Sequence, residues 1–226
     1  MISIFCTQAL EHALAELAPA LEQAAGQAVS PRFGTTGALV AELRAGASAD
    51  VVIVSRAALD KLEADGLISG PTTDIASTGI GLAVAAGRPH PDISTPDALR
   101  SALVAARAVA YPDPADGGAS GIHFAAVLDR LGIAEAIAAK AILVKAGGEV
   151  GRLAASGETE LAVQMISELL PVPGTEIIGP LPQPLQAVTT FAAGYGRDTS
   201  PARAVIATLR GDKAAAIMTH AGLEPL

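Results

Sequence analysis

Residues 29–54 read VSPRFGTTGALVAELRAGASADVVIV. Residues 51–54 of this stretch are valine and isoleucine only, and such a run is typical of a parallel strand that is buried on both faces. Residues 29–33 are the preceding strand candidate. A polar Gly-Thr-Thr-Gly turn at 34–37 and a helical pattern at 38–45 lie between the two strands. A strand, a helix and a strand in this order predict a parallel α/β sheet with a right-handed crossover.

The same alternation extends along the whole chain in both directions. Long apolar strands are expected at 79–86 and 187–193, and we interpret them as two crossing hinge strands between two lobes. We therefore expect lobe 1 to comprise residues 1–78 with 190–226 and lobe 2 to comprise 79–189, with a ligand cleft between them. The remaining expected strands are 2–6, 108–111, 141–144, 161–165 and 177–180, and the remaining expected helices are 8–25, 57–65, 123–131, 201–210 and 214–221. A further helix is expected to begin at residue 96, and residues 150–156 continue the alternation.

Composition excludes several classes of function. The chain has 226 residues with 15 Lys and Arg against 23 Asp and Glu, a formal net charge of −8. The basic residues are scattered, so nucleic acid is not an expected partner. The single cysteine, Cys6, excludes an internal disulfide and a multi-cysteine metal site. We expect neither a metal nor a cofactor.

The first residues carry no basic segment followed by a long apolar stretch, so no signal peptide is predicted. The longest apolar runs, at 79–87 and 103–110, are much shorter than a membrane span, and no membrane insertion is expected. We expect a cytoplasmic protein if the chain is complete as given, and a periplasmic one if a leader has been removed.

Three polar turns follow three predicted strands, each before a helix. Open α/β sheets bind ligands at this edge, and helix N-termini there attract anions. The alternative is that these residues are ordinary helix caps, which Ser and Thr prefer in any protein. The turns match neither a phosphate-binding loop nor a dinucleotide fingerprint. The predicted ligand-binding residues in them are Thr7, Gln8, Thr35, Thr36, Gly37, Gly118, Ser120 and Gly121.

Three further residues next to these strand ends are candidates for the same site. Arg32 precedes the Gly34 turn, while Ser55 and Arg56 follow the strand at 50–54. A guanidinium group can bind a carboxylate through two parallel hydrogen bonds. Both arginines are equally compatible with ordinary surface charges.

The turn at 34–37 and the segment Ala-Gly-Ala-Ser-Ala-Asp-Val at 45–51 resemble the signature of periplasmic molybdate-binding-type receptors. The usual text of that family is a Gly-Ser-Ser-Gly turn, a helix and then Gly-Ala-x-Ala-Asp-Val. The resemblance extends in weaker form to about Met165. It implies a two-lobed type II periplasmic-binding-protein-like fold with an anion clamped between the lobes. An exported member would also imply the permease of an ABC transporter as partner.

The sequence departs from this family at Gln164, where molybdate receptors have a tyrosine that contacts the oxyanion. An amide beside threonines suits a planar carboxylate better than a tetrahedral oxyanion. We therefore expect a di- or tricarboxylate ligand, with a molybdate receptor as the less favoured reading. Residues 164–169 and 179–194 also resemble an aconitate-isomerase-like branch of the same fold.

Two functions follow from this resemblance, namely binding alone and cofactor-independent isomerisation of an unsaturated carboxylate by an allylic proton shift. Isomerisation requires a general base close to an acidic C–H group. The candidate bases are His123, placed in the first turn of its predicted helix, and Glu168. Their alternative roles are a polar surface histidine and a charge that complements a helix dipole.

Overall fold

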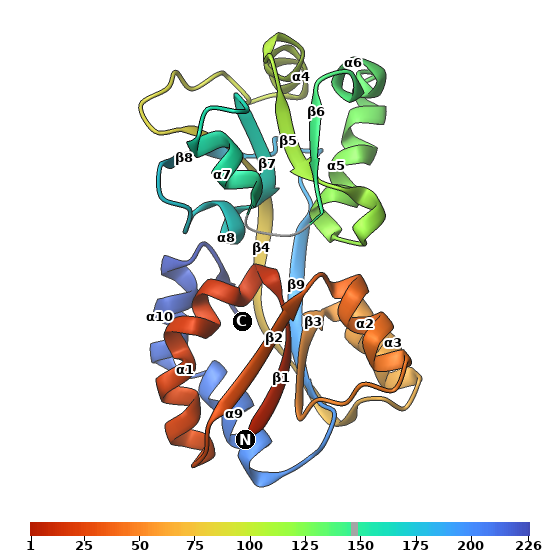
Figure 1. Ribbon diagram of the computed structural model, residues 1–226, viewed down its shortest axis with the longest axis vertical. Coiled ribbons are helices and arrows are strands. Elements are labelled where there is room, and N and C mark those ends of the chain that lie inside the picture. Colours follow the sequence, from red (N-terminus) through yellow and green to blue (C-terminus); the bar gives the residue numbers. More distant parts are fainter. Residues whose placement is uncertain (146–148) are drawn as a thin grey trace. The chain divides into compact units, whose positions relative to one another are not determined.

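The computed structural model describes residues 1–145 and 149–226. These residues form two compact units, one made of 1–78 and 189–226 and the other of 79–188. The chain passes from one unit to the other in strand β4 (Ser69–Ala85) and at the start of β9 (Val188–Tyr195) (Figure 1). Each unit has its own sheet and its own core.

The sheet of unit 1 has the strand order β2-β1-β3-β9. β1 is parallel to β2 and to β3, with Thr7 opposite Gly34 and Cys6 opposite Ile53, whereas β9 is antiparallel to β3. The first part of β4 pairs with the short β10. The bounds are β1 (Ile2–Thr7), β2 (Val29–Gly34), β3 (Val51–Ser55) and β10 (Glu224–Pro225).

Helices cover both faces of this sheet, with α1, α9 and α10 on one side and α2 and α3 on the other (Figure 1). Val52 and Val54 pack with leucines of α2 and α3, while Val51 and Ile53 are fully buried on the other face, because strand side chains alternate. The bounds are η1 (Gln8–Leu10), α1 (Glu11–Ala25), α2 (Thr36–Arg44), α3 (Arg56–Ala64), α9 (Ser200–Leu209) and α10 (Asp212–His220).

The sheet of unit 2 contains three parallel strands in the order β6-β5-β7. The second part of β4 is antiparallel to β7 on one side and to β8 on the other. The bounds are β5 (Val109–Pro112), β6 (Ala141–Val144), β7 (Leu161–Met165) and β8 (Thr175–Pro180).

Two apolar clusters lie on the two faces of this sheet. Leu161 and Val163 of β7 pack with α4, α5 and α6, whereas Ala162 packs with α7 and α8. The larger side chains are therefore on the face that carries the longer helices. The bounds are α4 (Pro96–Ala105), η2 (Pro114–Asp116), α5 (Ala119–Arg130), α6 (Ala134–Ala138), α7 (Glu149–Ala155) and α8 (Ile166–Leu169).

The structure corrects several predicted boundaries. β4 begins at Ser69, ten residues before the predicted start at 79, and its early part pairs with β10. Helix α5 begins at Ala119 instead of residue 123, because Gly118 is extended and caps it. Helix α2 begins at Thr36, so the second half of the predicted turn is its first turn. The short elements α6 and β10 were not expected.

Candidate functional site

The polar turns of unit 1 lie together at one edge of its sheet. β1, β2 and β3 are parallel neighbours, so their carboxyl ends, Thr7, Gly34 and Ser55, lie at the same edge. Thr7 and Ser55 precede helical segments as N-caps, and neither side chain caps the backbone. Gln8 begins the first of these two segments, and Thr36 begins α2, which follows β2. This edge therefore gathers hydroxyl groups and helix N-termini, the two kinds of donor that an anion needs.

Thr35 acts as a helix cap in this structure. Its Oγ1 accepts a hydrogen bond from Ala38 N at 3.1 Å, and its backbone is extended as a cap requires. Thr36 and Gly37 follow as the first two residues of α2. Capping by Thr35 agrees with the alternative interpretation of this turn as an ordinary helix cap, and its predicted contact with a ligand stays a prediction.

The two arginines next to this edge are held by acidic side chains of the same unit. Arg32 pairs with Glu42, and that hydrogen bond raises the pKa of Arg32 and lowers the pKa of Glu42. The role of Arg32 as a ligand residue stays a prediction.

Arg56 is more strongly constrained, since only 29% of its side chain is exposed. Its Nε donates to Asp74 Oδ1 at 2.6 Å, and its Nη1 donates to Thr72 Oγ1 at 2.8 Å and to Asp60 Oδ1 at 3.3 Å. Burial alone lowers the pKa of Arg56, but the bonds to Asp74 and Asp60 raise it overall. These contacts fix the guanidinium within unit 1, and its predicted contact with a ligand stays a prediction.

The corresponding edge of unit 2 lies where β5, β6 and β7 end. The loop after β5 leads through η2 to Gly118, the N-cap of α5, and to the buried Ser120. At Gly121 a Cβ atom would lie 2.3 Å from the carbonyl oxygen of Pro112, so only glycine allows the helix to approach the end of β5 so closely. The geometry gives Gly121 a packing role beside its predicted ligand role.

Gln164 and Ser167 are the most informative residues of this edge. They are 1% and 3% exposed and lie at the end of β7 and in α8. Gln164 Nε2 donates to Glu168 Oε1 at 2.9 Å. Gln164 Oε1 and Ser167 Oγ have no hydrogen-bond partner among the residues that the structure describes. Buried polar atoms are normally paired, so two orphaned atoms on adjacent segments indicate a place where a ligand or water supplies the missing bonds.

The structure places His123 differently from its prediction. It is the fifth residue of α5 and lies beyond the first turn, because the helix begins at Ala119. Its Nε2 is 2.7 Å from the carbonyl oxygen of Leu185, to which it donates a hydrogen bond. The ring is therefore anchored within unit 2, and only Nδ1 is left to act as a base.

Each unit thus brings its own predicted residues to the carboxyl edge of its own sheet. That a ligand lies between the two groups stays a prediction. Ser167 was not among the predicted site residues, although its place three residues after Gln164 at a strand end was a usable signal.

Within residues 1–145 and 149–226, no group of three or more His, Cys, Asp or Glu side chains is arranged to hold a metal ion. In the same part of the chain, no helix has both the length and the apolar character needed to cross a lipid bilayer.

Comparison with known structures defines the class of fold. The periplasmic molybdate-binding protein of Azotobacter vinelandii superposes with a TM-score of 0.76 at 20% identity, covering 99% of this chain and 98% of that one. The sulfate-binding protein SubI of Mycobacterium tuberculosis superposes with a TM-score of 0.77 at 19% identity, covering 100% of this chain and 86% of that one. The chain therefore has the type II periplasmic-binding-protein-like fold of the molybdate-binding type, as predicted.

Sequence comparison defines the family. A profile of the bacterial extracellular solute-binding proteins matches residues 2–224. A Pseudomonas protein named aconitate isomerase is 35% identical over 221 residues, which cover 93% of this chain and 82% of that protein. The chain belongs to the bacterial extracellular solute-binding protein family, and its predicted resemblance to molybdate-binding proteins and to the aconitate-isomerase branch is confirmed.

Proposed function

We propose that this protein binds a small polycarboxylate, and that an unsaturated tricarboxylate of the aconitate type is its ligand. The observation that carries the proposal is the pair of orphaned buried atoms, Gln164 Oε1 and Ser167 Oγ. The relative named aconitate isomerase supports the choice of ligand class.

The two orphaned atoms have different requirements. The Ser167 hydroxyl can donate to an anion, whereas Gln164 Oε1 is an amide oxygen and can only accept. The donor of the same amide, Nε2, is already bonded to Glu168. A fully ionised tetrahedral oxyanion offers acceptors only, so it satisfies Ser167 and leaves Gln164 Oε1 unpaired. A polycarboxylate can retain one proton on a second carboxyl group and satisfy both.

Calorimetric titration with cis-aconitate, trans-aconitate, citrate, molybdate and sulfate tests the proposal. We expect an aconitate isomer to bind more tightly than either inorganic anion. We expect Ser167→Ala to weaken binding by about tenfold or more, the value of a hydrogen bond to a charged group. Gln164→Leu removes a hydrogen bond between neutral groups and should weaken binding by about threefold to tenfold. Gln23→Leu, which changes an exposed glutamine of α1, is the matched control and should bind as the parent does. Binding of molybdate or sulfate alone would refute the proposal.

Isomerisation of the bound acid is the second candidate function, and one contact favours it. The Glu168 carboxylate is half-buried and accepts a hydrogen bond from Gln164, so it lies next to the orphaned atoms. A base there would remove a proton from the methylene carbon, the electron pair would shift the double bond by one position, and a proton would return to the far carbon. The reaction transfers no net electrons.

Proton NMR of cis- and trans-aconitate in D2O with the protein detects this reaction as interconversion with deuterium uptake. We expect Glu168→Gln to slow it at least about 100-fold, as for loss of a general base, while an aconitate still binds. Glu16→Gln, an exposed change on α1, should leave the rate unchanged. If His123→Gln lost the isomerisation while Glu168→Gln kept the full rate, His123 and not Glu168 would be the general base. If the parent protein binds an aconitate without converting it, the protein is a binding protein and not an isomerase.

A permease partner and the cellular compartment stay predictions.

A further inference from the structure

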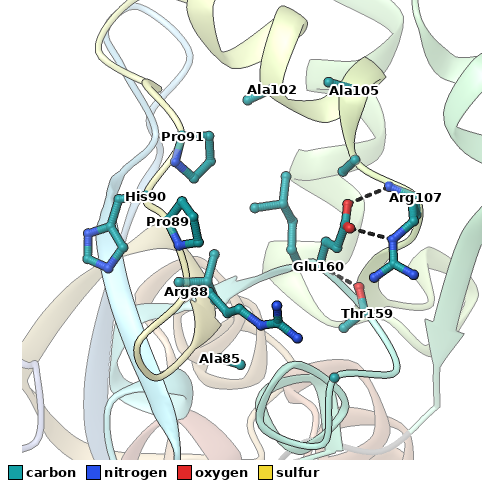
Figure 2. A pocket seen from close by; sticks show the side chains of 14 residues that line it. Ala85, Arg88, Pro89, His90, Pro91, Ala102, Ala105, Arg107, Thr159 and Glu160 are labelled. Carbon is teal, nitrogen blue, oxygen red and sulfur yellow. Dashed lines mark hydrogen bonds and ion pairs between the residues drawn. The ribbon is translucent and has the colours of Figure 1, made fainter.

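Unit 2 contains a pocket of about 340 Å³ at the edge of its sheet opposite to Gln164 and Ser167 (Figure 2). It lies where β4 ends, at Ala85, and where β7 begins, at Leu161. Its volume is within the range of small-molecule sites, about 300–1,000 Å³. None of the predicted ligand residues lines it, so it does not depend on the proposed function.

The inner wall of the pocket is apolar. Val84, Ala106 and Leu161 line it and are all buried. Figure 2 shows Pro89 and Pro91 on one side of the opening. Such a surface is suited to the hydrocarbon body of a ligand, and it would penalise a second or third carboxylate that lost its water.

The charged groups of the pocket are unbalanced. Arg107 N and Nε both donate to the Glu160 carboxylate, and this contact lowers the pKa of Glu160. His90, at the rim, pairs with Glu176, which does not line the pocket. Arg88 has no hydrogen bond or ion pair from its guanidinium to any residue that the structure describes, and Figure 2 shows it extending toward Thr159 and Glu160. In the described part of the chain, the Glu160 carboxylate is thus bonded to Arg107 alone, and Arg88 acts on it only through its charge, which also lowers the pKa of Glu160. The pocket therefore keeps an excess positive charge, although the net charge of the protein is −8.

We propose that this pocket is a second ligand site, which binds a small monocarboxylate with an apolar body. The carboxylate pairs with the guanidinium of Arg88, which can donate two parallel hydrogen bonds. The apolar body packs on Val84, Ala106 and Leu161. This chemistry differs from that of the carboxyl edge of unit 2, where the unpaired atoms belong to the buried polar side chains of Gln164 and Ser167.

Titration of the ¹⁵N-labelled protein with phenylacetate, followed by amide NMR shifts, tests the site. Phenylacetamide, which has the same shape without the charge, is the ligand control. We expect saturable shifts in residues 84–91, 102–107 and 159–161 with phenylacetate and none with phenylacetamide. Arg88→Gln should weaken binding about tenfold, as expected for loss of a charge-assisted pair. Arg210→Gln, which changes another exposed arginine of the chain, should leave the affinity unchanged.

A second variant tests the apolar part of the pocket. Ala102→Phe places a ring in the pocket from α4 and should abolish the shifts without unfolding the protein, because Ala102 is only half-buried. Equal binding of phenylacetamide, or unchanged affinity in Arg88→Gln, would overturn the proposal. Shifts confined to residues 35–37 and 164–168 would overturn it too, because the probe would then occupy the carboxyl edges. Absence of any saturable shift would also overturn it.

Discussion

Asp50 shows how a single residue of the family signature supports the fold. Ser3 donates to Asp50 Oδ2 from its backbone N at 2.8 Å and from its Oγ at 2.9 Å. Asp50 N in turn donates to Ser3 O at 2.9 Å. These bonds join β1 to the residue that precedes β3, so the aspartate of the signature fixes two neighbouring strands and thereby the turns that follow them.

We predict that Asp50→Ala lowers the free energy of unfolding by about 2–3 kcal/mol, because it leaves the Ser3 amide and hydroxyl without an acceptor in a largely buried place. Urea denaturation followed by circular dichroism measures the loss. Asp129→Ala, an exposed change on α5, is the matched control and should stay within about 0.5 kcal/mol of the parent. Equal stability of the two variants would show that the Ser3 contacts are not stabilising.

At the scale of a single element, α5 depends on close contact with the end of β5. A side chain at Gly121 would collide with the Pro112 carbonyl at 2.3 Å, and that atom belongs to the backbone and cannot rotate away. The helix would have to move outward. Its N-terminus, with Gly118 and Ser120, would then move away from the carboxyl edge of unit 2.

We therefore predict that Gly121→Ala destabilises the protein by about 1–3 kcal/mol, the usual cost of overpacking. Thermal and urea unfolding measure this cost. Gly211→Ala is the control, since a Cβ there would meet only Thr208 O at 3.5 Å, an ordinary contact. If Gly121→Ala were as stable as Gly211→Ala, the approach of α5 to Pro112 would not limit the position of the helix.

The same elements show what could be predicted from the sequence. The segment at 79–85 is apolar and was predicted as a strand, whereas the first part of β4 is polar and contains Gly70 and Pro71, which disfavour strands. β4 lies next to β9 in the sheet, and its residues Ala76 and Ser77 also pair with β10, so partners far away in the chain make this part a strand. Local patterns therefore predict the class of fold better than they predict where an element begins.

The candidate site follows the same rule. That Thr7, Thr35 and Gln164 come at strand ends could be predicted, because parallel strands end at one edge. That Arg56 is held by Asp74, 18 residues away, depends on how the chain returns to the sheet. The orphaned state of Gln164 Oε1 is likewise a property of packing, which no local pattern encodes.

At the scale of the whole chain, unit 2 is continuous in sequence and holds its own two apolar clusters. Its two ends are joined by Gln186. The Oε1 of Gln186 accepts from Ile80 N at 3.0 Å, and its Nε2 donates to Ile80 O at 2.9 Å. Ile80 O also accepts from Leu181 N at 2.9 Å, so the Gln186 amide binds β4 beside a backbone partner.

We predict that a fragment of residues 79–188 folds without the rest of the chain, since its length and core are those of a small domain. Dispersed amide NMR signals and a single cooperative urea transition are the expected results. The same fragment with Gln186→Ala should unfold at a lower urea concentration, because Ile80 N loses its Gln186 acceptor and Ile80 O keeps only the bond from Leu181 N. A fragment with no cooperative transition would show that unit 2 depends on unit 1.

The response of the whole molecule to acid follows from its exposed ion pairs. Hydrogen bonds lower the pKa of several carboxyl groups, among them that of Glu42 through Arg32, that of Glu176 through His90 and that of Asp198 through Arg203. A carboxyl group whose pKa is lower in the folded than in the unfolded protein stabilises the fold at any pH above its pKa in the unfolded protein. That stability is lost as the pH falls through the pKa of the group in the folded protein.

The ordinary pKa is 4.5 for Glu and 3.8 for Asp. The melting temperature should therefore be nearly constant from pH 7 to about pH 5.5, and it should decrease at pH values below about 4.5. Relief of repulsion as the charge of −8 is neutralised acts in the opposite direction, and a matched pair of variants separates the two effects. Arg203→Gln removes the partner of Asp198, whereas Arg210→Gln removes the same charge without removing a carboxylate's partner. Calorimetry from pH 3 to 7 should give a shallower acid slope in Arg203→Gln than in Arg210→Gln. If the two slopes were equal, the Asp198 pair would contribute nothing to acid sensitivity, and the loss of stability would arise from other carboxyl groups.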